Sequence, residues 1–520
     1  MNHATTPDEA ARTLRVHALF RMPELVGSVP GLAGTTIETG VASVEVAPAV
    51  ELRAVYHDTA DLRLTRWGAA LRRREGGPDE GWHLTLPAEG STAGTPDELV
   101  LPLAAGGVGE VPAEFADVVT ALARREPLVP VVSLATHRTT HVLRNTLGDV
   151  LGELVDDVVS IMDGDVVAGR FRELTLTPAP VVGESRGGAR LDAVVAVLGA
   201  HGAMPTSASR ASTALGPAAL GDPDVPEPQS VTPDEPAGDA VHAHLVTHVR
   251  RFLLQDMRVR RDLPDSVHQM RVAARRLRSG LRVFRPLVDE EWSRHLRDEL
   301  GWAASELGLS RDSEVLLARL DAHADELGEL DARLIHEHVD PMMQAKAEAG
   351  RAEALEAMRS ERHLALLDAL VDAANHPRLT EAAEAPAREA LPPLFGKAWR
   401  KLAKEVKALT LHGPAEEWHE TRITAKRARY AAEALVPVFG APAKGLASAL
   451  SNVTEQLGEH QDASIAQETC RALAAEFDGP TGFALGLLHA YEGEQELVAR
   501  VRLQEQWPAV RDLAKRTTLG

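Results

Sequence analysis

A basic segment that occurs twice constrains this chain more than any other feature of its sequence. Residues 267–286 read VHQMRVAARRLRSGLRVFRP, and residues 418–435 read WHETRITAKRARYAAEAL. His268 aligns with His419 at an offset of 151 residues (419 − 268 = 151), and the basic positions that follow keep the same offset. Both segments are rich in residues that favour helix.

A second motif recurs downstream at nearly the same spacing. ELGLSRD at 306–312 has a counterpart in QLGEHQD at 456–462, at an offset of 150 residues (462 − 312 = 150). Two different motifs that recur at almost one spacing indicate an internal duplication. The C-terminal part of the chain is therefore predicted to fold as two similar helical halves.

In each copy the cations fall on one face of the predicted helix. At 100° per residue, positions 268, 271, 275, 278 and 282 lie within an arc of roughly 80°. We call this face the basic stripe. Its first copy consists of His268, Arg271, Arg275, Arg278 and Arg282, and its second of His419, Arg422, Lys426 and Arg429, with Arg276 and Arg427 at the edge. The opposite side carries apolar residues such as Leu277 and Leu281, which can pack inside a bundle.

Cations aligned along one helical face repel one another, so a purely structural helix would normally intersperse carboxylates. No Asp or Glu interrupts residues 267–288. An Arg-rich solvated face is the alternative, but its repetition favours a binding surface for an extended polyanion. A weaker basic face lies at 396–409, where Lys397, Arg400, Lys401 and Lys404 are the candidate contacts.

The chain as a whole is acidic, with 56 Lys and Arg against 76 Asp and Glu and a formal net charge of −20. Charges are screened over about 8 Å at physiological ionic strength, so a local basic groove can act independently of that acidity. The single cysteine, Cys470, excludes an intrachain disulfide and a multi-thiolate metal site. Without a signal sequence or an apolar run of eighteen residues, the chain is expected to be cytoplasmic and not to contact a membrane.

The texture of the sequence changes near residue 210, and 520 residues exceed what one core accommodates. Before that point, short alternating segments between Gly and Pro predict antiparallel strands, with closure into a barrel as one outcome. Afterwards, helix-forming segments dominate. We predict a multidomain α+β protein with a β domain at 12–204, a Pro-, Ala- and acid-rich linker at 205–238, and an all-α duplicated bundle at 239–512, in halves of about 239–371 and 394–512.

The repeated pattern H-x-x-R-V/I-x-A-R/K-R-x-R, with LG-x-x-x-D downstream, resembles the CHAD family, whose name refers to a conserved histidine in an α-helical domain. The resemblance covers roughly 240–510. It implies two similar helical bundles around a basic groove that binds inorganic polyphosphate, and association with polyphosphate granules. If the family's ligand contacts are carried over residue by residue, the stripe residues are the ones that contact polyphosphate. Arginine forks suit bidentate contacts with phosphate.

The segment YHDTADLRLTRWGAALRRREGGPDEGWHLTLP at 56–87 resembles the CYTH family, which implies an eight-stranded triphosphate-tunnel barrel. Enzymes of this family carry the pattern E-x-E-x-K on their first strand, and its three defined positions are Arg15, His17 and Leu19 in this chain. Thr85 stands where a tunnel lysine is expected, and a late E-x-E is Thr175 and Thr177. Arg72, Arg74 and Arg138 persist as residual phosphate contacts, and Glu153 persists as the one candidate metal ligand.

These replacements lead us to expect a non-catalytic barrel, since metal-dependent hydrolysis of triphosphates needs carboxylates. The leading hypothesis is a polyphosphate-binding, granule-associated protein without a cofactor. The first alternative is an active triphosphatase or polyphosphatase that uses Mg²⁺ or Mn²⁺. A nucleic-acid binder is the second alternative, which the low aromatic content of 4% disfavours. The sequence identifies no protein partner.

Overall fold

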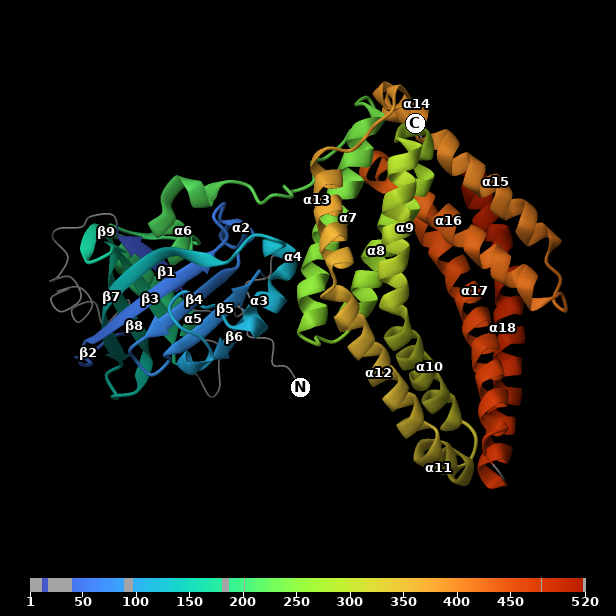
Figure 1. Ribbon diagram of the computed structural model, residues 1–520, viewed down its shortest axis with the longest axis horizontal. Helices are drawn as coiled ribbons and strands as arrows, with labels where there is room; N and C mark the ends of the chain where they lie inside the picture. Colours follow the sequence, from blue (N-terminus) through green and yellow to red (C-terminus); the bar gives the residue numbers. More distant parts are fainter. Residues whose placement is uncertain are drawn as a thin grey trace. The chain divides into compact units, whose positions relative to one another are not determined.

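The chain divides into two compact units, Met1–Asp224 and Val225–Gly520. The computed structural model describes residues 12–16, 40–87, 97–179, 187–200, 202–477 and 479–517. The first unit is built on an antiparallel sheet and the second consists of helices (Figure 1). The predicted change from strands to helices is therefore confirmed.

Ten strands form the sheet of the first unit. They are β1 Arg12–Val16, β2 Ser43–Val46, β3 Val50–Asp58, β4 Ala70–Glu75, β5 Gly81–Leu86, β6 Asp97–Leu101, β7 Val129–Arg144, β8 Val150–Asp163, β9 Val166–Pro178 and β10 Ala203–Pro205. Their order is β10-β1-β9-β8-β7-β3-β4-β5-β6, with β2 also paired to β7. Among the strands described, the pairing ends at β6 and at β10, so the closed barrel expected from the family resemblance is not shown.

Side-chain alternation along these strands builds two apolar clusters. One consists of Tyr56, Leu134, Val159 and Phe171 together with Ala211 of helix α6, Arg210–Leu215. The other gathers Leu143, Leu154, Leu174 and Leu176 with Val194 and Leu198 of helix α5, Gly187–Ala200. Because alternate residues of a strand point to opposite faces, the remaining positions are free to line a polar cavity.

The connection between β3 and β4 is fixed by one buried carboxylate. Asp58 is 1% exposed and accepts hydrogen bonds from the backbone N–H groups of Leu64 (2.9 Å) and Thr65 (2.8 Å). The Thr65 hydroxyl donates a third bond of 2.7 Å. These bonds satisfy the first N–H groups of the short helix α2, Arg63–Arg66, and so hold the start of β4.

The stretch predicted as a linker contains ordered structure. Helix α6 begins after Ser209, whose hydroxyl caps it by accepting from the N–H of Ser212 at 3.0 Å, and the 3-10 helix η3, Gly216–Leu220, follows. The indole of Trp67 donates to Asp224 at 2.7 Å, which ties the end of the first unit to its sheet. Local capping and Ala-rich composition thus produce helix inside a segment that also contains many prolines.

The second unit is helical over most of its length. Its main helices are α7 Ala237–Arg260, α8 Ser266–Val283, α9 Glu290–Glu306, α10 Gly308–Ala324, α11 Glu329–His338, α12 Asp340–Met358, α13 Glu361–Asn375, α15 Pro392–Ala408, α16 Ala415–Phe439, α17 Ala441–Ala474 and α18 Pro480–Arg516. The long pair α17 and α18 is antiparallel (Figure 1). Within the part of the chain that the structure describes, none of the helices combines the length and apolarity needed to cross a membrane.

The ends of the helices carry the duplication that the sequence predicts. Helix α9 begins at Glu290 and α17 begins at Ala441, an offset of 151 residues (441 − 290 = 151). Helix α10 ends at Ala324 and α17 ends at Ala474, an offset of 150 (474 − 324 = 150). The single helix α17 therefore corresponds to α9 and α10, which are separate helices in the first copy.

The two basic segments form helices α8 and α16, which pack against each other. The guanidinium of Arg275 lies 5.9 Å from the ring centre of Tyr430, and Arg276 pairs with Glu433 at 3.5 Å. Helix α8 also approaches α7 closely at Gly280, where an added Cβ would lie 2.1 Å from Nε2 of His244. Only glycine permits this approach.

Gly280→Ala should lower the free energy of unfolding by about 1–3 kcal/mol, because the new methyl group must displace the His244 ring. That ring is held 5.5 Å from the ring of Phe284 and donates to the carbonyl oxygen of Arg276. Urea unfolding followed by circular dichroism measures the effect. The matched control is Gly445→Ala on α17, where a Cβ meets nothing within 4 Å and alanine should stabilise the helix by about 1 kcal/mol. Equal stabilisation by both changes would contradict the close approach.

Candidate functional site

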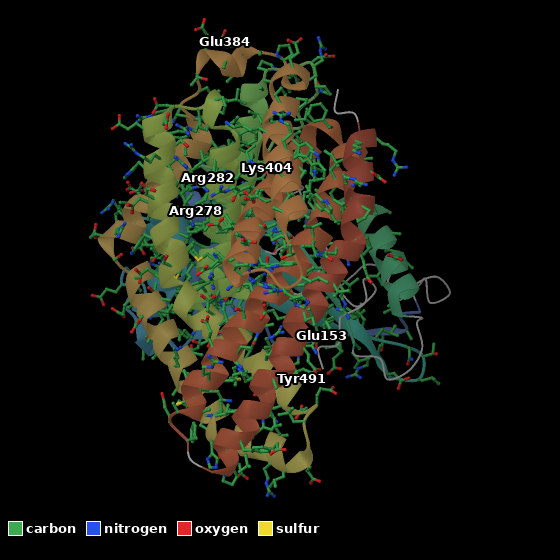
Figure 2. All side chains as sticks on the ribbon, turned by 90° about the vertical axis from the view of Figure 1, so that its right-hand side faces the viewer. Glu153, Arg278, Arg282, Glu384, Lys404 and Tyr491 are labelled. Carbon is green, nitrogen blue, oxygen red and sulfur yellow. The ribbon has the colours of Figure 1, made fainter. Side chains whose placement is uncertain are left out.

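A cavity of about 760 Å³ opens between α8, α9, α15 and α16, and we call it the basic groove. Its cationic lining residues are Arg275, Arg278, Arg282, Arg285, Arg297, Lys397, Lys401, Arg422, Lys426 and Arg427. Among the described residues that line it, Asp298 is the one carboxylate. Figure 2 labels the exposed side chains of Arg278 and Arg282 on α8 and of Lys404 on α15. The groove therefore concentrates positive charge within an acidic protein.

Helical periodicity places these cations together. Of the stripe positions, Arg275, Arg278 and Arg282 of α8 and Arg422 and Lys426 of α16 line the groove, while Ala274, Ala425 and Ala428 on other sides of the same helices are fully buried. Because α8 and α16 pack against each other, these basic residues meet at one cavity. Helix α15 adds Lys397 and Lys401 from the weaker basic face.

Several of these cations are partly buried and have donor atoms that no described acceptor satisfies. The Nε atoms of Arg275, Arg422 and Arg427 are inaccessible to solvent and have no hydrogen-bond acceptor within the described part of the chain. Burial and the positive charge of Arg422 lower the pKa of Lys426 to about 7. Burial lowers the pKa of Arg275 as well, and neighbouring arginines add to this effect. Positive charge that the protein leaves uncompensated creates a demand for an anionic ligand.

The histidine end of the stripe is different, because carboxylates and amides contact it. Arg271 donates to Asp312 at 2.8 Å. In the second copy the charge of Arg422 acts on Asp462, whose pKa burial nevertheless raises. Both aspartates come from the downstream repeated motifs, so those motifs supply the counter-ions of the first arginine in each stripe. His419 bonds through Nδ1 to the side-chain oxygen of Gln461.

Other predicted contacts lie beside the groove. Glu433 pairs with both Arg276 (3.5 Å) and Arg429 (3.2 Å), and Arg429 also donates to the hydroxyl of Thr454. The predicted residues that line the groove are Arg275, Arg278, Arg282, Lys397, Lys401, Arg422, Lys426 and Arg427. Those outside its lining are His268, Arg271, Arg276, Arg400, Lys404, His419 and Arg429.

The structure adds two cations that the sequence did not indicate. Arg285 belongs to the quoted basic segment but follows the helix, in the 3-10 turn after α8. Arg297 lies on α9 in EWSRHLRDEL, where neighbouring carboxylates make it resemble an ordinary solvated position. The positive charge of Arg282 contributes to lowering the pKa of Arg297, after burial, which places the two side chains in one electrostatic cluster. No periodicity of α9 could have revealed this contact.

The sheet of the first unit encloses a second cavity, of about 710 Å³. Arg72, Arg74 and Arg138 line it, as do Thr85 and Thr175. In this cavity each of these three arginines has a carboxylate partner. The pairs are Arg72 with Glu98 (2.9 Å), Arg74 with Asp79, and Arg138 with Asp157 (2.7 Å).

A further arginine, Arg210 of α6, enters this cavity from the segment predicted as a linker. It donates to Glu173 at 2.6 Å and pairs with Asp157, which is 0% exposed. The carboxylates that could bind a divalent metal are thus already bound to arginines. Glu153 is exposed and lies outside the lining, while His17, Leu19 and the side chain of Arg15 lie outside the described residues. The described part of this cavity does not fit a catalytic Mg²⁺ or Mn²⁺.

Comparison with known sequences agrees with both halves of this architecture. The family model of the CYTH domain matches residues 38–176, and that of the CHAD domain matches residues 243–471. Two proteins of Mycobacterium tuberculosis, the uncharacterized proteins MT2285 and Rv2226, are each 34% identical over 531 residues. The alignments cover 97% of this chain and 97% of each relative.

Two solved structures resemble part of the chain. PptA from Streptomyces chartreusis is 28% identical, with a TM-score of 0.46, and the match covers 53% of this chain and 100% of that one. The CHAD domain from the plant Ricinus communis is 24% identical, with a TM-score of 0.45, and the match covers 56% of this chain and 96% of the plant domain.

Lys426→Met should stabilise the free protein, because it removes a cation that burial and neighbouring arginines disfavour. Since the pKa in the folded state is about 7 and the ordinary value is 10.5, the cost of charging Lys426 is fully present below pH 7. It disappears as the pH rises through 10.5. We expect a gain of about 2 kcal/mol at pH 6 that shrinks towards pH 10, measured by urea unfolding. Lys444→Met, at an exposed position of α17, is the control and should show no such pH dependence.

Proposed function

We propose that this chain, which belongs to the family of proteins that join a CYTH domain to a CHAD domain, binds inorganic polyphosphate in its basic groove. One observation carries the proposal: ten cationic side chains line the groove, and Asp298 is the one carboxylate among its described lining residues. A ligand that supplies many negative charges in a small volume matches this arrangement.

A flexible chain of phosphates suits the groove better than a single phosphate does. The cations come from four separate segments, α8 with the 3-10 helix η4 (Arg285–Leu287) that follows it, α9, α15 and α16, so their ligand must present charge in several directions. Guanidinium groups can bind phosphate oxygens in pairs, while Lys397, Lys401 and Lys426 add point charges. A repeating polyanion satisfies all of these groups without a fixed shape of its own.

Nucleic acid fits the groove less well. Proteins that bind single strands combine cations with accessible aromatic rings on which bases stack. Among the described lining residues Tyr430 is the one aromatic side chain, and it is 5% exposed and packed near Arg275 and Arg429. The groove therefore offers contacts to phosphate but no platform for bases.

The first unit is proposed to be non-catalytic, because Asp157 and Glu173 at its cavity are paired with arginines. This arrangement disfavours the alternative of a metal-dependent triphosphatase or polyphosphatase. A protein that binds a polymer stored in granules is expected to associate with those granules in the cytoplasm. Binding through the helical unit then accounts for the function without a cofactor.

Changing Arg282, Arg427, Lys397 and Lys401 together to glutamine should weaken binding of long-chain polyphosphate by about 100-fold at fixed salt. These side chains lie at the groove and, among the described residues, have no ion-pair partner of the kind that Asp312 is for Arg271, apart from the contact of Lys401 with Glu405 at 3.6 Å. The slope of log affinity against log salt should also fall by about three. Isothermal titration calorimetry at several salt concentrations measures both quantities.

The matched control changes two arginines and two lysines to glutamine at exposed positions outside the groove, namely Arg333, Lys346, Lys444 and Arg502. It alters the net charge equally and should leave the affinity within about twofold. An equal loss in both variants would show that only overall charge matters and would overturn the groove assignment. Equal affinity of the native chain for RNA at matched salt would favour the nucleic-acid alternative.

The full chain should release no phosphate from tripolyphosphate or nucleoside triphosphates in the presence of Mg²⁺ or Mn²⁺. The physical reason is that Arg138 and Arg210 neutralise the buried Asp157, which leaves the described lining of the cavity without a free carboxylate pair. A malachite-green phosphate assay measures turnover. Turnover that disappears when Arg72 and Arg74 are replaced by glutamine would show an active tunnel and refute this expectation.

A further inference from the structure

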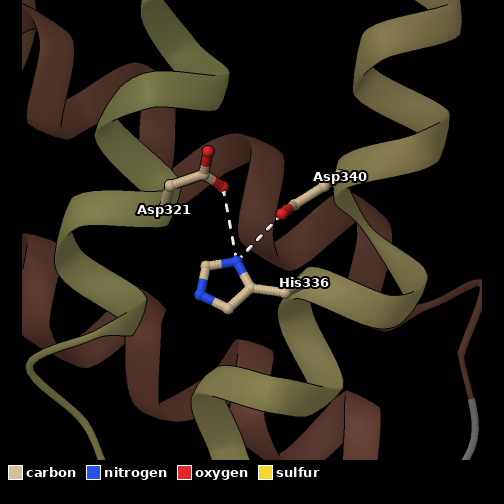
Figure 3. Close-up of side chains that lie close together, drawn as sticks. All are labelled: Asp321, His336 and Asp340. Atoms are coloured by element: carbon tan, nitrogen blue, oxygen red, sulfur yellow. Dashed lines mark hydrogen bonds and ion pairs between the residues drawn. The ribbon is translucent and has the colours of Figure 1, made fainter.

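A second polar cluster lies where α10, α11 and α12 of the helical unit meet, apart from the residues that line the basic groove. It consists of Asp321, His336 and Asp340, one from each helix (Figure 3). Nδ1 of His336 lies 2.9 Å from an oxygen of Asp340 and 3.7 Å from an oxygen of Asp321. One potential ligand atom of each side chain lies within 4.8 Å of the other two.

The negative charge of this cluster exceeds what the described protein groups compensate. One carboxylate oxygen of Asp321 and one of Asp340 are inaccessible to solvent and have no hydrogen-bond donor among the described residues. Asp325 adds a third carboxylate.

A third carboxylate orients the imidazole. Nε2 of His336 lies 3.1 Å from Asp325, so a proton on Nε2 is donated to that carboxylate. The lone pair of Nδ1 then points between Asp321 and Asp340 (Figure 3). Histidines that bind metals commonly donate their other N–H to a carboxylate in this way, which fixes the tautomer and the direction of the ring.

We propose that Asp321, His336 and Asp340 bind a divalent transition-metal ion of the zinc class, with Asp325 as the carboxylate that orients the histidine. Tetrahedral coordination with metal–ligand distances near 2.1 Å separates two ligand atoms by about 3.4 Å. The two N···O distances of 2.9 and 3.7 Å bracket that value. A mixed set of imidazole and carboxylate selects such an ion over Mg²⁺ or Ca²⁺, which prefer oxygen ligands.

The position of the site indicates what the ion does. Each ligand is adjacent in sequence to a residue of one apolar cluster, namely Leu320, Ile335 and Val339. The ion therefore joins three short helices directly beside the core that packs them against α17 and α18. The proposed role is structural and is independent of polyphosphate binding.

The test uses the full chain after treatment with EDTA and removal of the chelator. Co²⁺ titration followed by visible absorption should give one saturable site with the bands of tetrahedral coordination, and Zn²⁺ should displace it and raise the melting temperature. His336→Gln and Asp340→Asn should each abolish this site. Asp325→Asn should weaken it by about 10–100-fold, as expected for a residue that orients a ligand.

The matched control is His376→Gln on α13. His376 also pairs with an aspartate four residues away, Asp372, at 3.3 Å, but both side chains are exposed and lack a third ligand. This change should leave Co²⁺ binding and the Zn²⁺ effect unaltered. The proposal is overturned if the native chain shows no saturable site, or if His336→Gln and Asp340→Asn, folded by circular dichroism, retain the native stoichiometry and spectrum.

Discussion

The contact between α8 and α16 brings together positive charges that the protein itself does not neutralise. Each helix carries its cations on one face, and the packing of α8 against α16 lets the two faces meet at one cavity. Bringing these charges together costs free energy, as the low pKa of Lys426 and the guanidinium nitrogens without a described acceptor indicate. Apolar packing elsewhere in the unit has to offset it, and an anionic ligand would relieve it.

The duplication places basic residues on both α8 and α16, but the two copies are not equivalent. Helices α9 and α10 of the first copy are separated at Leu307, whereas the corresponding α17 is continuous through Leu457. Asp312 is exposed and pairs with Arg271, while burial raises the pKa of Asp462, its counterpart in the second copy. The groove cations of the first copy are all arginines, whereas the second copy contributes Arg422, Arg427 and the half-buried Lys426.

The sequence predicts the parts of the site that depend on local periodicity. The stripe on α8 and α16 follows from a 3.6-residue repeat. Eight of the fifteen contacts predicted from the sequence, including two lysines of α15, line the groove. Arg297 and Arg210 could not be predicted, because each reaches its cavity through tertiary packing of a segment whose own pattern looks solvated. The same limit applies to the sheet: alternation predicts strands, but strand pairing decides whether a sheet closes, and the described pairing ends at β6 and β10.

Two arginine-rich cavities in one chain show that residue type alone does not define a phosphate site. In the first unit Arg72, Arg138 and Arg210 each have a carboxylate partner, so the arginines stabilise the sheet and its connection to α6. In the second unit most of the groove cations have no ion-pair partner among the described residues, and the exceptions are Arg285 with Glu290 and Lys401 with Glu405. A charged ligand entering the first cavity must break existing ion pairs, whereas the same ligand entering the second replaces repulsion with attraction. Affinity should therefore follow the charge that each cavity leaves uncompensated, which is a property of the packing and not of the arginine count.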